Sequence, residues 1–152
     1  MNVIDAIQKA EDNEDVKKLR GYFLCSCFAC IKSKDEKIKE WTLLYYNPEK
    51  NLVLDCFIND KFVTVGDETP PISEVEKPDF HNIDTTIEEV LDKVGKNFSE
   101  GLVNVLITLH KKASVIWTIN FITADMNATT FDVDVKTGKI LREESTSLIR
   151  KL

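Results

Sequence analysis

One pattern occurs twice in this chain, about half the chain length apart, and it constrains the fold more than any other feature. The first copy reads KEWTLLYYNPEKNLVLDCFINDKFVTV, from Lys39, and the second reads VIWTINFITADMNATTFDVDVKTGKIL, from Val115. The tryptophans Trp41 and Trp117 align, and each is followed by a threonine. Because internal repetition is the mark of a duplicated structural unit, the sequence predicts two similar units in tandem.

Each predicted unit reads as a helix followed by antiparallel strands. Asn2 can cap an apolar stripe that begins at Val3, and Thr85 can cap a second stripe that begins at Ile87. Gly138 suits a hairpin turn with positive φ, and the tail STSLIRKL predicts a short helix over a sheet edge. Alternating segments predict strands at residues 22–32, 37–47, 51–58, 61–65, 102–111, 115–124, 129–135 and 139–143.

The predicted fold class is α+β, with two tandem helix-plus-antiparallel-meander units. In each unit a helix packs on one face of a three- to four-stranded antiparallel sheet. The first α+β repeat covers residues 1–66 and the second covers residues 84–152. Residues 67–83 contain three of the four prolines and are predicted to be a Pro-rich linker.

The segment WTINFITADMNATTFDVDVKTGKIL resembles the second half of a PepSY-type domain. In that family a tryptophan-bearing strand is followed by a strand that ends in Asp, a T-G turn and a closing strand. The corresponding residues here are Trp117, Asp134, Thr137, Gly138 and Lys139. A tandem pair of such units also resembles the beta-lactamase inhibitory proteins in architecture. Both resemblances imply a noncatalytic role in protein binding or inhibition.

The cysteines offer an alternative, a thiol-based metal or redox site. Strand alternation places Cys25 and Cys27 on one face and Cys30 on the other. Cys56 is expected two strand spacings away, roughly 9–10 Å, whereas a zinc site needs every thiolate about 2.3 Å from one ion. The repetition also aligns three of the four with Val or Ile. We therefore expect buried core thiols and predict no metal and no cofactor.

The outer face of the first sheet is the predicted binding surface. It is apolar, whereas the outer face of the second sheet is mostly polar, and large apolar patches rarely stay in contact with water. This face can be covered in three ways: by the linker, by a second copy of the chain in a homodimer, or by a different protein. The residues predicted to bind are Tyr22, Leu24, Phe28, Leu44, Tyr46 and Phe57.

Composition and motifs argue against several classes of function. The chain is 43% hydrophobic and 30% charged with a net charge of −6, which disfavours binding to nucleic acid or to anionic membranes. It carries no secretory leader and no membrane-spanning run, so we expect a cytoplasmic protein. His81 falls in the linker and His110 ends a strand, and no nucleophile or nucleotide-binding motif occurs. We expect a protein that is not an enzyme.

Overall fold

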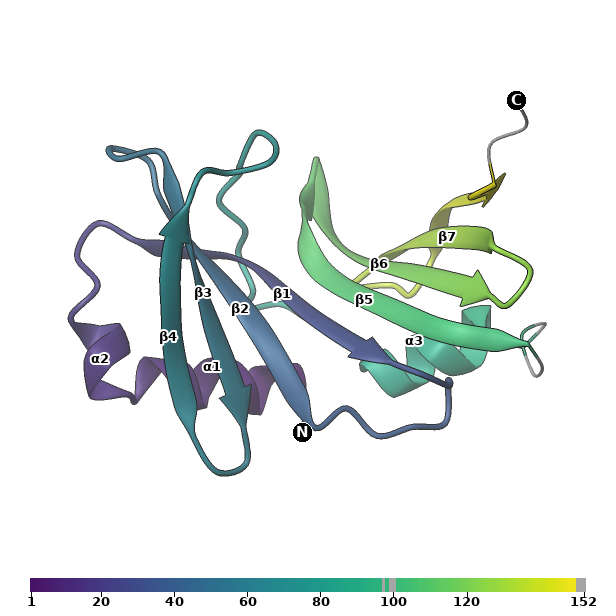
Figure 1. The fold of residues 1–152 in the computed structure, drawn as a ribbon, viewed down its shortest axis with the longest axis horizontal. Helices are drawn as coiled ribbons and strands as arrows, with labels where there is room; N and C mark the ends of the chain where they lie inside the picture. The colour runs from purple at the N-terminus through teal and green to yellow at the C-terminus, as the bar shows by residue number, and fades with distance from the viewer. Residues whose placement is uncertain (97, 99–100, 150–152) are drawn as a thin grey trace.

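The computed structural model describes residues 1–96, 98 and 101–149. Its three helices within that range are α1 (Val3–Glu11), α2 (Glu14–Lys17) and α3 (Ile87–Val94). The eight strands follow the predicted segments within three residues at each end, except that β4 and β8 each end four residues later than predicted (Figure 1). They are β1 (Phe23–Ile31), β2 (Glu40–Asn47), β3 (Leu52–Asn59), β4 (Val63–Thr69), β5 (Leu102–Lys112), β6 (Ser114–Thr123), β7 (Asn127–Asp134) and β8 (Ile140–Ser147).

The prediction of two tandem α+β units, each with its own sheet, is wrong. All eight strands form one antiparallel sheet in the order β4-β3-β2-β1-β5-β6-β7-β8, and the helices are few and short. The two meanders are joined by pairing of β1 with β5, from Cys27 opposite Leu109 to Ile31 opposite Val105. An unpaired β1 and an unpaired β5 would each expose a row of backbone donors and acceptors, and their pairing removes both edges.

Helix α1 begins where the sequence predicts, and α3 begins one residue later. Asn2 caps α1 by accepting a hydrogen bond from the Asp5 amide at 3.1 Å. Thr86, and not Thr85, is the N-cap of α3, and it forms a reciprocal capping box with Glu89. Thr85 is instead turned to the sheet, where its hydroxyl donates to the Val135 carbonyl at 2.8 Å.

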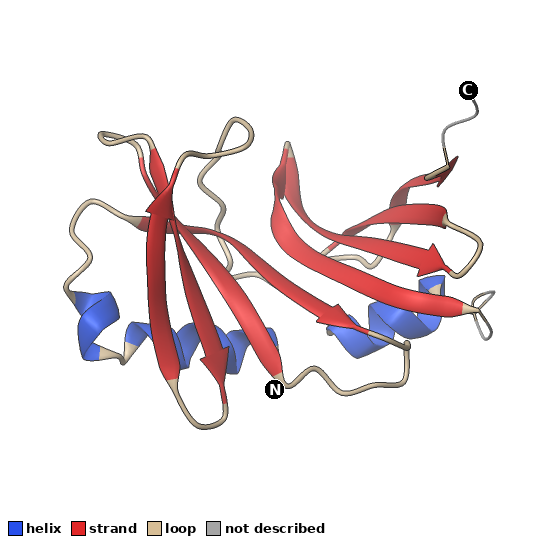
Figure 2. Ribbon diagram, in the orientation of Figure 1, coloured by secondary structure: helices blue, strands red, loops and turns tan. Residues whose placement is uncertain are grey.

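The core lies between one face of the sheet and the helices α1 and α3, which cover the same face (Figure 2). Trp41 and Trp117 are both fully buried at its centre, with ring centroids 6.4 Å apart. Their strands, β2 and β6, are three strand spacings apart, roughly 14 Å in a flat sheet. The two rings therefore lean toward each other across β1 and β5, and a single core spans both meanders.

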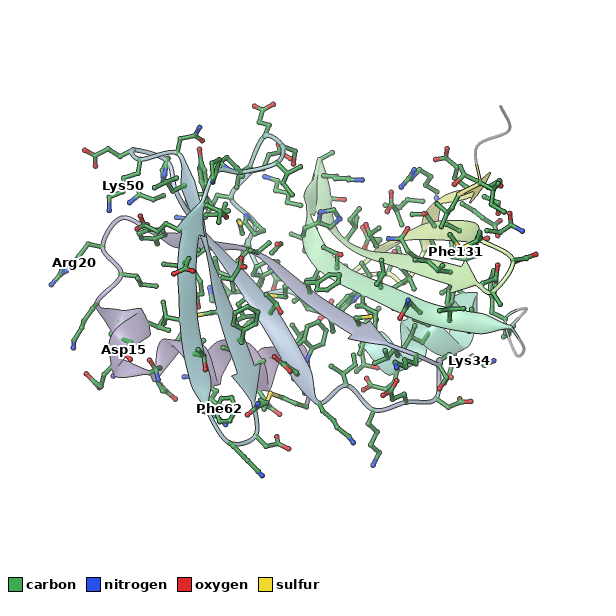
Figure 3. All side chains as sticks on the ribbon, in the orientation of Figure 1. Asp15, Arg20, Lys34, Lys50, Phe62 and Phe131 are labelled. Atoms are coloured by element: carbon green, nitrogen blue, oxygen red, sulfur yellow. The ribbon has the colours of Figure 1, made fainter. Side chains whose placement is uncertain are left out.

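Polar contacts tie the connections to this core. The Trp41 indole donates to the Met1 carbonyl at 2.9 Å, and the Trp117 indole donates to the Thr85 hydroxyl at 3.2 Å. Lys34, in the β1–β2 connection, donates to the Gly95 carbonyl at the end of α3 (Figure 3). These part-buried bonds tie the residue before the N-cap of α1 and the residue before the N-cap of α3 to the sheet, and the end of α3 to the β1–β2 connection, and partial burial strengthens them.

The chain between β4 and α3 passes from the outer face of the sheet to the helix face (Figure 1). Residues 69–76 lie over the outer face, Pro78 is buried, and Phe80 packs against the core. The first three residues of the predicted linker, 67–69, belong to β4. Of the predicted helical tail, residues 145–147 belong to β8 and residues 150–152 lie outside the described range.

Candidate functional site

A β-bulge in β1 changes which residues face outward. Phe23 pairs with Tyr46 and Leu24 pairs with Tyr45, but Ser26 pairs with Leu44, so Cys25 is an extra residue in the ladder. An extra residue shifts the alternation of side chains by one position. Before the bulge Phe23 therefore shares the outer face with Tyr46, and their rings meet edge to face at 5.7 Å.

Two of the six predicted binding residues lie on the helix side of the sheet as a result. Leu24 is opposite the buried Tyr45, and both Tyr22 and Leu24 pack against the core. The Tyr22 hydroxyl donates to the Glu68 carboxylate, and this bond raises the pKa of Tyr22 to about 12. The alternation rule missed this arrangement because one sequence gives no sign of a bulge.

The other four predicted binding residues are on the outer face, where they are half-buried. Phe28 sits opposite Thr42 and Thr108, at the junction of β2, β1 and β5. Leu44 and Tyr46 lie on β2, and the Tyr46 hydroxyl donates to the Asn51 side chain at 2.8 Å. Phe57 lies on β3 with its ring against Gly66 of β4, where a Cβ atom would come within 3.4 Å of it.

A cavity of about 390 Å³ lies between the outer face and the linker. Its floor includes Ser26, Leu44 and Val53, and residues 69–76 of the linker form its roof. Pairing of β1 with β5 stops at Cys27 and Leu109, so the next residues of each strand diverge. His110, a position after Leu109, lines the cavity from the β5 side, as Ser26 does from the β1 side. The cavity therefore lies where the two central strands of the sheet, β1 and β5, stop pairing.

The linker covers this cavity, but its largest aliphatic side chain, that of Ile72, does not fill it. Ile72, at the middle of the roof, is fully exposed at 104% of its reference area. Val75 is half-buried, and the remaining roof positions are Thr69, two prolines, Ser73 and two glutamates. Of the three coverings considered for the outer face, the linker is therefore present over Leu44 and Val53, and it leaves a ligand-sized space beneath it.

The charged side chains that line the walls and roof of the cavity are predominantly acidic. Asp55, Glu74 and Glu76 line it, against Lys111. Burial lowers the pKa of His110, aided by Lys112 and opposed by Asp132, so the imidazole is neutral at pH 7. A low-dielectric apolar floor strengthens the attraction between wall carboxylates and a cation. The cavity is thus suited to an apolar chain that carries a positive charge.

A ladder of polar side chains runs across the outer face from the cavity to the sheet edge. His110 Nε2 lies 2.7 Å from the Thr118 hydroxyl, which donates to Asp132 Oδ1 at 2.7 Å. Arg142 Nε donates to Asp132 Oδ2 at 2.8 Å, and the same guanidinium reaches Glu144 at 2.7 Å. Burial opposes ionisation of Asp132, but these hydrogen bonds outweigh it and hold the pKa below its ordinary value.

Sequence analysis missed this ladder. It placed His110 at the end of a strand but gave none of the contacts that the side chain makes there. Thr118 and Asp132 are buried on a face that was expected to meet water. His110 is half-buried in β5, one of the two central strands of the sheet. Alternation in β5 to β7 puts His110, Thr118 and Asp132 on one face, but their mutual distances depend on strand register, which a single sequence does not fix.

The four cysteines are all free thiols. Cys25, Cys27 and Cys56 are buried and Cys30 is exposed. Burial raises the pKa of Cys25 and of Cys56 to about 11, and it also raises the pKa of Cys27. A raised pKa disfavours the thiolate that metal binding and redox exchange require. Within residues 1–96, 98 and 101–149, no three Cys, His or acidic side chains gather closely enough to hold a metal ion.

Comparisons with known proteins give one similar fold and no family. No model of a known protein family matches the chain, and no curated protein sequence matches it either. A crystal structure described as a putative lipoprotein from Clostridium difficile 630 is similar, with a TM-score of 0.65 and 19% sequence identity. The match covers 96% of this chain and 93% of that one. At this identity the likeness shows a shared fold alone.

In the part of the chain that the structure describes, no helix has the length and apolar character needed to cross a bilayer.

Proposed function

We propose that this chain is a noncatalytic protein-binding module that takes an extended segment of a partner protein on its outer sheet face. The cavity under the linker carries this proposal. Leu44 at its floor, with Phe28, Tyr46 and Phe57 beyond it, offers half-buried apolar surface, which is typical of an interface. Tyr22 and Leu24 have no part in this surface because they lie on the helix side.

Charge supports a basic partner over a second copy of the chain. The walls contribute Asp55, Glu74 and Glu76, and the chain as a whole has a net charge of −6. A second copy would bring the same excess of negative charge to a wall that already carries it, which costs free energy. A segment that alternates aliphatic and basic side chains matches both the apolar floor and the acidic wall.

Selection of peptides from a random displayed library tests the proposal, with the affinity of synthetic binders then measured by fluorescence anisotropy. We expect the selected peptides to combine aliphatic residues with Lys or Arg. Leu44→Asp should weaken binding tenfold or more, a loss of about 1.4 kcal/mol. Asp55→Lys should weaken the binding of the same peptides while leaving the apolar floor of the cavity intact. The matched control is Leu141→Asp, at an exposed leucine of the edge strand β8, which should bind as the wild type does.

Three outcomes contradict the proposal. The first is the selection of peptides without basic residues, and the second is equal binding to wild type and Leu44→Asp when circular dichroism shows both folded. The third is a concentration-dependent dimer in light scattering that Leu44→Asp dissociates, because the face would then be a self-interface.

A further inference from the structure

The Thr118 hydroxyl donates its proton to one neighbour, the Asp132 carboxylate. Asp132 is held as a carboxylate by Arg142, which donates to Oδ2 at 2.8 Å, and a carboxylate can only accept hydrogen bonds. The Thr118 oxygen lies 2.7 Å from Oδ1 of that carboxylate. A hydroxyl has a single proton, so Thr118 donates it to Asp132 and has only lone pairs to offer its other neighbour.

That neighbour is His110, and the tautomer of its ring follows. Nε2 lies 2.7 Å from the Thr118 oxygen, and this oxygen can only accept there, so Nε2 must carry the proton. A neutral imidazole has one protonated nitrogen and one acceptor nitrogen. Nδ1 is therefore the acceptor of a ring that lines the cavity beneath the linker.

We propose that His110 Nδ1 is the hydrogen-bond acceptor for an ammonium or guanidinium group of the ligand in the cavity, with Thr118 and Asp132 holding the ring in the required tautomer. The inference rests on the proposed function and specifies its ligand: an aliphatic chain over Leu44 and Val53 that ends in a cationic N–H donor. His110 is a binding residue in this scheme, and Thr118 is a positioning residue.

The surrounding charges set the pH dependence. The groups around the ring are Asp132 from β7, reached through Thr118, Lys111 and Lys112 from its own strand, and across the cavity Asp55, Glu74 and Glu76. Protonation of the ring removes the acceptor at Nδ1 and adds a positive charge beside the ligand. The affinity for a cation should therefore fall as the pH drops through the His110 pKa, which lies below the ordinary value of histidine.

Three six-carbon probes test the inference by NMR: n-hexylammonium, 1-hexanol and hexanoate. Each is titrated into protein with ¹⁵N-labelled histidine, and shifts of the Leu44 and Val53 methyl groups report entry into the cavity. Long-range ¹H–¹⁵N spectra report the tautomer, and His81, exposed in the linker, is the internal control because the chain has only two histidines. We expect a fixed Nε2–H tautomer at His110 alone, and n-hexylammonium binding at least fivefold more tightly than 1-hexanol.

Two variants separate the acceptor from the rest of the cavity. His110→Phe should reduce the preference for n-hexylammonium over 1-hexanol to the part that Asp55, Glu74 and Glu76 supply, without preventing 1-hexanol from entering. Thr118→Val removes the hydroxyl, so the His110 tautomers should mix and the pH profile of n-hexylammonium binding should move, which a merely structural role would not produce.

The outcomes distinguish the inference from the proposed function. An equal preference for n-hexylammonium over 1-hexanol in the wild type and in His110→Phe overturns the inference and leaves the binding surface standing. An Nδ1–H tautomer at His110 also overturns it. Methyl groups of Leu44 and Val53 that respond to no probe contradict both the inference and the role of the cavity.

Discussion

Truncation of Ile107 to alanine tests whether the two meanders fold as one cooperative unit. Ile107 is fully buried in β5, opposite Ala29 of β1 and Ile119 of β6, so it lies at the seam that joins the meanders. Ile107→Ala removes three carbons, about 2.4 kcal/mol at about 0.8 kcal/mol per buried group. The cavity left behind adds to this, which gives an expected loss of roughly 3 kcal/mol.

The assay is urea unfolding followed by tryptophan fluorescence in two backgrounds, Trp117→Phe and Trp41→Phe. Each background keeps one of the two tryptophans, so each reports one meander. With a urea dependence of about 2 kcal/mol per molar, the midpoint should fall by about 1.5 M in both backgrounds. The control is Ile72→Ala, the same truncation at a fully exposed position, which should change stability by less than about 0.5 kcal/mol.

Unequal shifts would refute the reasoning. If Ile107→Ala lowered the midpoint reported by Trp117 and left the one reported by Trp41 unchanged, the meanders would unfold separately. The pairing of β1 with β5 and the contact of the two tryptophans would then contribute too little to couple them.

Two further predictions concern buried and exposed side chains. Titration of the native protein with a thiol reagent should show one cysteine that reacts fast and three that react slowly, because Cys30 is exposed and the other three are buried. Cys30→Ser should remove the fast phase. A fast phase that survives the substitution would mean that one of the other three cysteines is accessible. Tyr45→Phe should raise the unfolding free energy by about 1 kcal/mol in urea titration, because the buried Tyr45 hydroxyl has no hydrogen-bond partner among the described residues. A loss of stability instead would show that this hydroxyl is satisfied in solution.

Local structure was largely predictable because its causes are local. Alternation of apolar residues gave the strands, and several of the inward positions that it marked are fully buried, among them Leu43, Cys56 and Val133, although Val103 is exposed. The cap at Asn2 follows from the side chain of that residue alone. Gly138 has φ +73°, as its turn requires.

The candidate site was predictable in part. Phe28, Leu44, Tyr46 and Phe57 are on the outer face, as alternation indicated. Tyr22 and Leu24 are not, because the bulge at Cys25 reverses the faces before it. The linker was one of the coverings considered, but the cavity beneath it depends on where the strands of the central seam diverge.

The sequence alone determined where the strands begin, where α1 and α3 lie and which side chains are apolar enough to be buried, because period and capping are properties of neighbouring residues. The tertiary structure decided that β1 pairs with β5, so that two predicted sheets are one. That pairing is made by backbone groups that every residue carries, and no side-chain pattern specifies which edge meets which. It also decided the contacts of His110, since the ladder from His110 through Thr118 to Asp132 exists only when three strands lie in register.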